Sequence, residues 1–240
     1  VAGNRDLLSV ALNTPADRLP ITYRERCQGY LPAETVNDAP WQEVVLEGDA
    51  LDLRKLPIPL HFKVDAAPYI TAGQIAARDP ETGIDTIGFH RLMLKGKNKL
   101  GLSIHSRRRM FEFHRRAEER GEPLPAVITI GVHPVHYMGS MAYHYPPNVR
   151  KYDIIGALFK EPYRVARSQT ADIEVPAGAE IVIEGKILAD TREPEGPFGE
   201  SHGYIALEEF NNTMDVTAIT MQKKPVVSSI ISQVTPSESS

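Results

Sequence analysis

The chain has 240 residues, of which 42% are hydrophobic and 24% charged, and its net charge is −4. This composition is that of a globular protein with a sizeable core, and the acidic balance argues against nucleic acid or an anionic membrane as a partner. No apolar run approaches the length of a membrane span and the first residues do not resemble a secretory signal, so we expect a cytoplasmic protein. The lone cysteine, Cys27, excludes an intrachain disulfide framework.

The first part of the chain predicts a partial N-terminal α/β region over residues 1–54. Pro57, Pro59 and Pro68 then make a stiff, extended stretch, because each proline fixes one backbone dihedral. We therefore place a domain boundary there, and residues 55–240 form a strand-rich body.

Short segments rich in Val, Ile and Thr dominate this body and are separated by clusters of Gly, Pro, Asp or Asn, a pattern typical of strands. The predicted strands are 69–76, 85–94, 126–132, 180–189, 214–221 and 226–232. About five to eight strands with few helices indicate a β-barrel or a β-sandwich.

One basic segment, residues 105–120, predicts an amphipathic helix. Met110, Phe113 and Ala117 recur at helical spacing, and Ser106 is the expected N-cap residue. Glutamates within the segment dilute its positive charge, so a solvated helix face is favoured over a nucleic-acid patch, which stays the alternative.

The segment REPEGPFGESHGY, residues 192–204, places two acids on either side of Gly-Pro-Phe-Gly. The glycines free the backbone for tight conformations and the proline fixes one dihedral, so we predict a specified bend. Such a bend holds Glu195 and Glu200 close together, and the pKa values of two neighbouring acids tend to separate, so that one donates a proton while the other stays ionised. A hairpin turn with solvated acids is the alternative interpretation.

These motifs, taken in order, resemble a known family. The segments are IDTIGFHRLMLKGKNKLGLSIH (84–105), PVHYMGSMAYHYPP (134–147), DIEVPAGAEIVIEGKI (172–187), REPEGPFGESHGY (192–204) and IISQVTPSE (230–238). They are similar to segments of UbiD-type decarboxylases, the group that contains the polyprenyl-hydroxybenzoate and ferulic acid decarboxylases. The resemblance covers about residues 50–240.

The resemblance implies an α+β fold in which residues 55–240 form a split β-barrel, an FMN-binding architecture of the flavin-reductase type. It implies reversible, non-oxidative decarboxylation of an aromatic acid, hydroxylated or not, or of an α,β-unsaturated acid, with prenylated FMN as cofactor. A separate flavin prenyltransferase would supply that cofactor. Members of the family are longer than this chain, so we expect that a C-terminal domain of the family is absent here and that the full-length protein is a homo-oligomer.

The resemblance also implies a catalytic group formed by Arg91, Glu195 and Glu200. Loss of CO2 leaves a carbanion equivalent, so such a site must hold a carboxylate and deliver a proton. Arg91 would orient Glu195 or the substrate carboxylate, and Glu200 would donate the proton, with a pKa raised by partial burial or by the neighbouring acid. In the alternative, Arg91 pairs with a surface acid and the turn only joins strands.

The cofactor site implied by the resemblance contains Thr86, Ile87, Gly88, Phe89, His90, Arg91, Ile104, His105, Ser140, Met141 and Lys151. Family members that bind a divalent cation at the cofactor phosphate use an asparagine, a histidine and a glutamate, and Thr86, His105 and Lys151 occupy those positions. Only His105 is a usual ligand, so Mn²⁺ or Mg²⁺ would lack two of its ligands here; K⁺ is a further candidate ion. One hypothesis is that the Lys151 ammonium replaces the cation, and an exposed loop lysine is the alternative.

Two other functions stay open at this stage. One is a non-catalytic flavin-binding or assembly protein, because two usual metal ligands are replaced. The other is an FMN oxidoreductase of the split-barrel type. No GxGxxG, P-loop or GxSxG motif is present, which argues against dinucleotide, ATP and serine-hydrolase chemistry.

Overall fold

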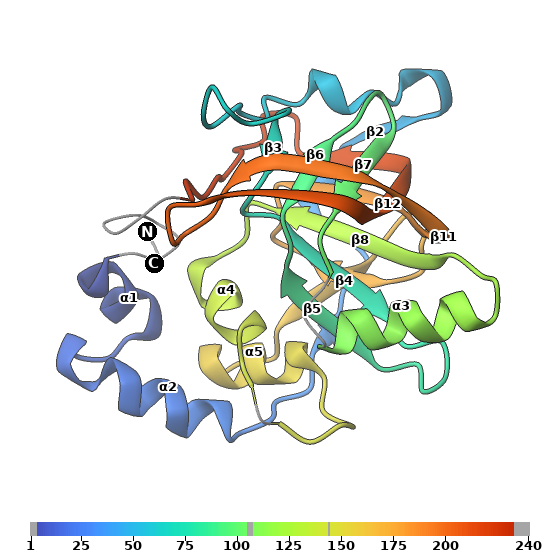
Figure 1. Ribbon diagram of the computed structural model, residues 1–240. Helices are drawn as coiled ribbons and strands as arrows, with labels where there is room; N and C mark the ends of the chain where they lie inside the picture. Colours follow the sequence, from blue (N-terminus) through green and yellow to red (C-terminus); the bar gives the residue numbers. More distant parts are fainter. Residues whose placement is uncertain (1–3, 105–107, 144, 233–240) are drawn as a thin grey trace.

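The computed structural model describes residues 4–104, 108–143 and 145–232 (Figure 1). The α-helices are α1 (Arg5–Leu12), α2 (Leu19–Cys27), α3 (Arg109–Glu119), α4 (Pro134–Ser140) and α5 (Lys151–Phe159). The strands are β1 (Glu34–Thr35), β2 (Val44–Glu47), β3 (Tyr69–Ile70), β4 (Gln74–Arg78), β5 (Asp85–Phe89), β6 (Leu92–Leu94), β7 (Lys99–Leu102), β8 (Leu124–Ile130), β9 (Arg164–Arg167), β10 (Glu174–Pro176), β11 (Ile181–Gly199) and β12 (Ile205–Met221). Short 3-10 helices cover Ala16–Arg18, Pro40–Gln42, Gly48–Ala50 and Leu53–Lys55.

The largest unit is one curled sheet of antiparallel pairs, with the order β3-β6-β7-β12-β11-β8-β4-β5 and with β2 paired to β12. The long strands β11 and β12 arch across it as a hairpin (Figure 1). β5 and β6 follow each other in the sequence but lie near opposite ends of this order. The two residues between them, His90 and Arg91, therefore cross the open side of the curl.

The sheet is buried on both faces, because successive residues of a strand point to opposite sides. In β11, Ile181 and Ile183 belong to the core inside the curl, whereas Val182 belongs to a second core on the outer face. In β8, Ile128 and Val127 divide in the same way. This two-sided burial explains why these strands are continuous apolar runs rather than alternating ones.

Helices cover both cores. Met110, Phe113 and Ala117 of α3 pack into the inner core, as the helical spacing predicted. Tyr152 and Ile155 of α5 pack into the outer core, against the small sheet β1-β9-β10. Helices α1, α2, α4 and α5 lie together on one side of the curled sheet (Figure 1).

Four of the predicted strand segments need correction at their ends or interior. Residues 85–94 form β5 and β6 rather than one strand, and residues 69–76 form β3 and β4. Gly73 lies between β3 and β4, and a Cβ there would lie 2.6 Å from Ile70 Cγ2. The strand is therefore interrupted at a position where only glycine fits. The predicted strands 180–189 and 214–221 are parts of the much longer β11 and β12, whereas 126–132 corresponds to β8.

The strand predicted at 226–232 is wrong. This segment has no ladder partner among the described residues. Its backbone N–H groups instead donate to side chains, from Val226 to Glu180 Oε2 at 3.1 Å and from Ile230 to Thr71 Oγ1 at 2.8 Å.

The helices are more numerous than the sequence indicated, because α4 and α5 were not predicted. The described chain is thus a mixed α/β fold built on a curled antiparallel sheet. α3 begins at Arg109 with Arg108 as its N-cap residue, and the predicted N-cap Ser106 lies outside the described residues. β2 joins the first 54 residues to the large sheet through β12, and the boundary at residue 54 stays a prediction. No helix in the described ranges is both long and apolar enough to cross a bilayer.

Candidate active site

The first six residues of the PEGPFGE motif, 194–199, lie within β11, and only Glu200 belongs to the turn that joins β11 to β12. The strand runs to Gly199, and the turn follows it, closed by bonds from Glu200 N to Tyr204 O (2.8 Å) and from Gly203 N to Glu200 O (3.0 Å). The predicted bend is instead a β-bulge, because the pairing register shifts between Glu195 and Phe198. One extra residue on β11 breaks the alternation of sides.

Glycine is required at the bulge. Gly196 has a φ of 104°, and a Cβ there would lie 2.6 Å from Ala206 O. Residues five apart in a regular strand point to opposite faces. The bulge and the following turn allow Glu195 and Glu200 to reach the same side chain.

That side chain is Arg91. Its Nη2 lies 2.7 Å from Glu195 Oε2, and its Nε lies 3.1 and 3.2 Å from the two Glu195 oxygens. Its Nη1 donates to Glu200 Oε1. The guanidinium also lies over the Phe198 ring, 5.7 Å from the ring centre. The three side chains predicted as the catalytic group are therefore in direct contact.

The two acids differ in environment. The Glu195 side chain is 0% exposed and accepts a further hydrogen bond from Asn211 Nδ2 at 3.1 Å, whereas the Glu200 side chain is 30% exposed. Glu195 is thus a buried carboxylate whose charge is held by Arg91 and Asn211. Glu200 is paired to the same arginine and still reaches solvent.

The charges of this cluster affect its neighbours. Burial alone would lower the pKa of Arg91, but hydrogen bonds and the negative charge of Glu195 raise that pKa above its ordinary value. Burial and the Glu195 charge also raise the pKa of Tyr69, which stays a neutral phenol. Tyr69 packs on Phe198 with ring centres 4.2 Å apart. Arg91 is therefore a permanent cation that lies over the Phe198 ring, on which Tyr69 packs.

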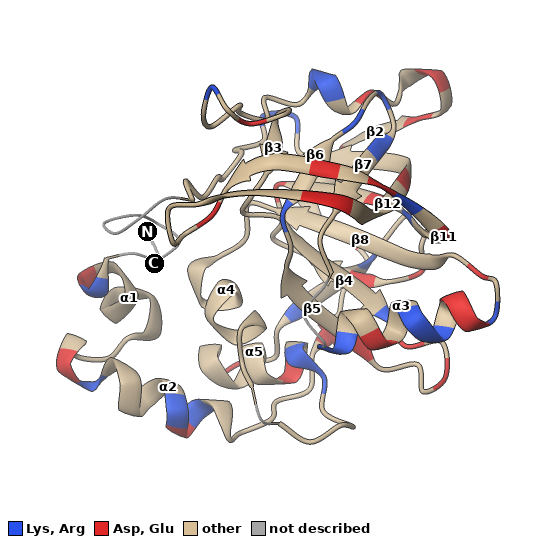
Figure 2. Cartoon of the chain, in the orientation of Figure 1, with Lys and Arg blue, Asp and Glu red and all other residues tan. Residues whose placement is uncertain are grey.

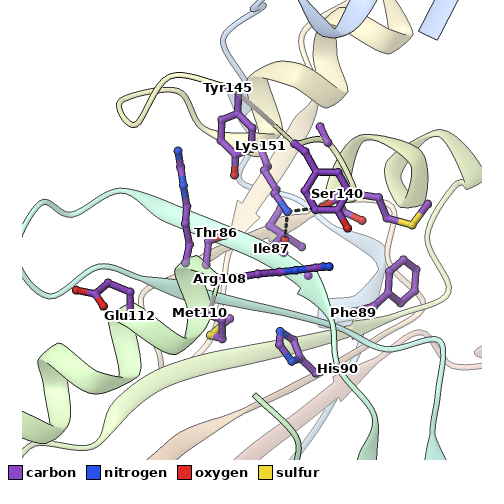
Figure 3. A pocket seen from close by; sticks show the side chains of 15 residues that line it. Thr86, Ile87, Phe89, His90, Arg108, Met110, Glu112, Ser140, Tyr145 and Lys151 are labelled. Atoms are coloured by element: carbon purple, nitrogen blue, oxygen red, sulfur yellow. Dashed lines mark hydrogen bonds between the residues drawn. The ribbon is translucent and has the colours of Figure 1, made fainter. Parts of the chain in front are cut away.

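A cavity of about 590 Å³ lies beyond β5, between the starts of α3 and α5 (Figure 3). Its lining comes from β5 and the residue after it, the start of α3, the end of α4 and the start of α5. The lining residues are Thr86, Ile87, Gly88, Phe89, His90, Arg108, Arg109, Met110, Glu112, Ser140, Met141, Ala142, Tyr143, Tyr145 and Lys151. The volume is within the range of sites for small molecules and cofactors.

Lys151 is anchored at this cavity by main-chain oxygens. Its Nζ lies 2.6 Å from Ile87 O and also donates to Ser140 O (Figure 3). Burial, and then the charges of Arg109 and Arg108, lower the pKa of Lys151 to about 8. The alternative of an exposed loop lysine is therefore wrong: Lys151 is half-buried and is the first residue of α5.

The structure gathers most of the predicted cofactor-binding residues. Those that line the cavity are Thr86, Ile87, Gly88, Phe89, His90, Ser140, Met141 and Lys151. Arg91 does not line it and points to the acids, although it directly follows His90. Ile104 is 2% exposed and belongs to the inner core. His105 lies outside the described residues.

The described residues do not fit a divalent cation. They contain no group of three His, Cys, Asp or Glu side chains that could hold one. Among the described residues that line the cavity, Glu112 is the only one with a carboxylate, and it is paired with Arg115 and Arg116. Asp153, an acid two residues after Lys151, accepts a hydrogen bond from the N–H of Ala33 at 3.2 Å.

Some site residues were not recognised in the sequence. Arg108 and Arg109 were assigned to a solvated helix face, but they line the cavity, and Arg109 lies 4.2 Å above the Tyr145 ring. The signal was the arginine run immediately before an amphipathic helix. Asn211, which contacts Glu195, gave no local signal beyond an Asn-Asn pair in a strand.

Comparison with known proteins identifies the family. The UbiD family, described as 3-octaprenyl-4-hydroxybenzoate carboxy-lyase Rift-related domain, matches residues 34–234. The chain belongs to the UbiD family. The resemblance found in the sequence motifs is thereby confirmed.

Solved structures of UbiD-class enzymes share its fold. An evolved dimeric form of HmfF from Pelotomaculum thermopropionicum, in complex with prFMN, is 37% identical with a TM-score of 0.90, over 99% of this chain and 55% of that one. Apo 3,4-dihydroxybenzoic acid decarboxylase (AroY) from Klebsiella pneumoniae is 26% identical with a TM-score of 0.89, over 99% and 51%.

A curated relative is also a decarboxylase by name. The anhydromevalonate phosphate decarboxylase of Methanothermobacter thermautotrophicus is 39% identical over 147 residues, which cover 61% of this chain and 34% of that protein. An uncharacterized protein of Aquifex aeolicus is 34% identical over 220 residues, which cover 87% of this chain and 44% of that protein. The chain thus spans about half, or less, of the length of the relatives it matches.

Proposed function

We propose that this UbiD-family chain catalyses the reversible, non-oxidative decarboxylation of an aromatic acid, hydroxylated or not, or of an α,β-unsaturated acid, with prenylated FMN as cofactor. The observation that carries the proposal is the cluster in which Arg91 holds both Glu195 and Glu200. Similarity to HmfF in complex with prFMN and to a 3,4-dihydroxybenzoic acid decarboxylase supports both the cofactor and the substrate class.

The cavity fits a flavin nucleotide. Ile87, Phe89 and Met110 offer apolar surface, whereas Lys151 and Arg108 offer positive charge for a phosphate. When bound, prenylated FMN would supply an electron-accepting ring that stabilises the negative charge left by departing CO2. His90 lines the cavity, and Arg91, the next residue in the chain, contacts both acids.

The chain's own residues account for the proton. Glu200 donates a proton to the carbon that loses CO2, and its carboxylate is then stabilised by Arg91. Because its side chain is 30% exposed, Glu200 regains a proton from solvent. Glu195, fully buried and held by Asn211, keeps the guanidinium in place. In the reverse direction the same carboxylate removes the proton before CO2 adds.

The proposal extends to the source of the cofactor, the barrel around it and the oligomeric state. We propose that a flavin prenyltransferase provides the cofactor, that residues 55–240 form a split barrel of the flavin-reductase type around it, and that the full-length protein is a homo-oligomer. The curled antiparallel sheet supports the barrel, and the dimeric HmfF structure supports the oligomer.

Replacement of Glu200 by Gln tests the proton-transfer role. We expect Glu200→Gln to lower the rate of CO2 release by about 10²- to 10⁴-fold, because the amide cannot donate a carboxylic proton. The protein is co-expressed with a flavin prenyltransferase, and CO2 release and carboxylate-dependent H/D exchange are measured over a panel of aromatic and acrylic acids. Glu209→Gln, an exposed acid on β12, is the matched control and should leave the rate unchanged. Full turnover in Glu200→Gln would remove that residue from the mechanism.

The same preparation separates the alternatives. Bound flavin without CO2 release or H/D exchange would favour a non-catalytic flavin-binding protein. Bound FMN that NAD(P)H reduces would favour an oxidoreductase. The ultraviolet-visible spectrum and mass of the bound cofactor decide between them.

A further inference from the structure

The cavity carries an unbalanced positive charge. Of the described residues, Lys151, Arg108 and Arg109 line it, against one carboxylate, that of Glu112. Glu112 already pairs with Arg115 and Arg116, and it points away from Lys151 (Figure 3). In the part of the chain that the structure describes, none of the three lining cations pairs with a carboxylate. A ligand with about two negative charges, such as a phosphate monoester, would balance this site.

Lys151 is preorganised to meet that ligand. An ammonium group has three protons, and two of them are held by Ile87 O and Ser140 O. Both acceptors are main-chain carbonyls, which carry no charge that would neutralise the ammonium. The third proton is left for a ligand in the cavity. Ser140 is fixed in turn, since its hydroxyl accepts from Gln74 Nε2 at 2.6 Å and donates to Tyr137 O at 2.8 Å.

Two helix N-termini reinforce the positive field. α3 begins at Arg109 and α5 begins at Lys151, and both starting residues line the cavity. Basic residues at the two starts lie near each other below β5 (Figure 2). The N-terminus of a helix carries partial positive charge and favours phosphate binding. The helix termini thus add to the side-chain charges rather than acting alone.

The same arrangement opposes a divalent cation. Mg²⁺ and Mn²⁺ require oxygen ligands, usually with carboxylates among them. Here two carbonyl oxygens at the cavity are already occupied by an ammonium, whose charge repels a second cation. Thr86 occupies the position at which the metal-binding family members have their asparagine ligand, and it is buried, with 4% of its surface exposed.

We propose that the Lys151 ammonium replaces a divalent cation, so that this chain binds the phosphate of its flavin cofactor through Lys151, Arg108 and Arg109 without a metal. The inference rests on the proposed function only in taking a flavin nucleotide as the ligand. It concerns the phosphate site and is independent of catalysis.

Flavin binding tests the inference without any measurement of turnover. The purified full chain is titrated with FMN and with riboflavin, which lacks the phosphate, in EDTA and in millimolar MnCl2. We expect the Kd for FMN to agree within about twofold between the two conditions, and riboflavin to bind at least about tenfold more weakly. Metal analysis of the FMN-loaded protein should find no stoichiometric divalent ion.

Variants of Lys151 give the second measurement. Lys151→Gln should weaken FMN binding by about 10- to 100-fold and leave riboflavin binding unchanged, because one charge-assisted hydrogen bond is lost. Thr86→Asn combined with Lys151→Glu should bind FMN poorly in EDTA and regain affinity with MnCl2. Lys186→Gln, an exposed lysine on β11, is the matched control and should bind as the wild type does. Circular dichroism confirms that each variant is folded.

The outcomes separate this inference from the proposed function. Tight FMN binding that is lost in EDTA, one divalent ion per chain, or unchanged FMN affinity in folded Lys151→Gln would overturn the inference and leave a flavin enzyme in place. Binding of neither FMN nor riboflavin would overturn both. Metal-independent FMN binding together with inactive holoenzyme would support the inference and contradict the decarboxylase.

Discussion

Arg91 and Lys151 are both largely enclosed cations, but the two regions around them balance charge in different ways. Arg91 lies between Glu195 and Glu200, and Asn211 completes the bonding of the buried acid. Lys151 lies between two neutral carbonyls, with Arg108 and Arg109 as further lining cations. The first region is compensated by its own side chains. The second is compensated only when an anion binds.

The difference indicates which region is built to react and which is built to bind. A compensated cluster keeps its geometry in the free protein, as proton transfer at a fixed position requires. An uncompensated pocket has raised electrostatic free energy in the free protein and lowers it on binding an anion. A substitution in one region should therefore leave the properties of the other region unchanged.

The largest expected effect is on the compensated region. Arg91→Met would leave Glu195 buried and unpaired, and we expect the free energy of unfolding to fall by about 3–5 kcal/mol, measured by urea denaturation. Arg167→Met is the matched control: that arginine pairs with Asp172 on the surface, where loss of an ion pair should cost about 1 kcal/mol or less. Equal losses in the two variants would contradict a special role for the Arg91 cluster.

A smaller effect is expected at the bulge that positions the acids. Gly196→Ala forces a side chain into a left-handed conformation and against Ala206 O, so we expect stability to fall by about 1–3 kcal/mol. CO2 release should fall as well, whereas the Kd for FMN should not change. In Gly178→Ala the new Cβ meets no atom within 4 Å, and this control should behave as the wild type. A loss of FMN affinity in Gly196→Ala would show that the two regions are not independent.

The smallest effect concerns pH and the uncompensated region. Because the pKa of Lys151 is lowered to about 8, the free protein loses this proton above pH 8, and binding of a phosphate dianion must restore it. FMN affinity should therefore fall by up to about tenfold per pH unit above pH 8, while riboflavin affinity stays constant. Burial lowers the pKa of His90 and raises that of Tyr145, so both stay neutral near pH 8. A flat pH profile for FMN would argue against a bond from Lys151 to the phosphate.

Local sequence patterns could predict individual helices and strands, but not everywhere that the strands end or pair. The spacing of Met110, Phe113 and Ala117 predicted α3, and the apolar run around Ile183 predicted a strand, because these signals depend on periodicity and burial. The break of 85–94 into two strands could not be predicted, since it depends on where the sheet curls open. The segment 226–232 has a strand's composition, but composition does not determine whether its N–H groups pair with another strand or, as here, bond to side chains.

The site shows the same division. The family motifs predicted the contact among Arg91, Glu195 and Glu200. The contact joins the link between β5 and β6 to β11, which is paired with neither strand, so the resemblance predicted it and local spacing could not. Arg108 and Arg109 could not be assigned from sequence alone, because an arginine on a helix looks the same whether it faces solvent or a cavity. Only the packing of α3 beside β5 separates these cases.

The link between β5 and β6 also limits how the chain can vary in length. His90 lines the cavity and Arg91 reaches the acids, and consecutive Cα atoms are always about 3.8 Å apart. Surface loops usually tolerate insertions and deletions, but one residue more or fewer here would exchange the sides to which these two residues point. Natural or engineered homologues should therefore show length variation at almost any loop before they show it between residues 89 and 92.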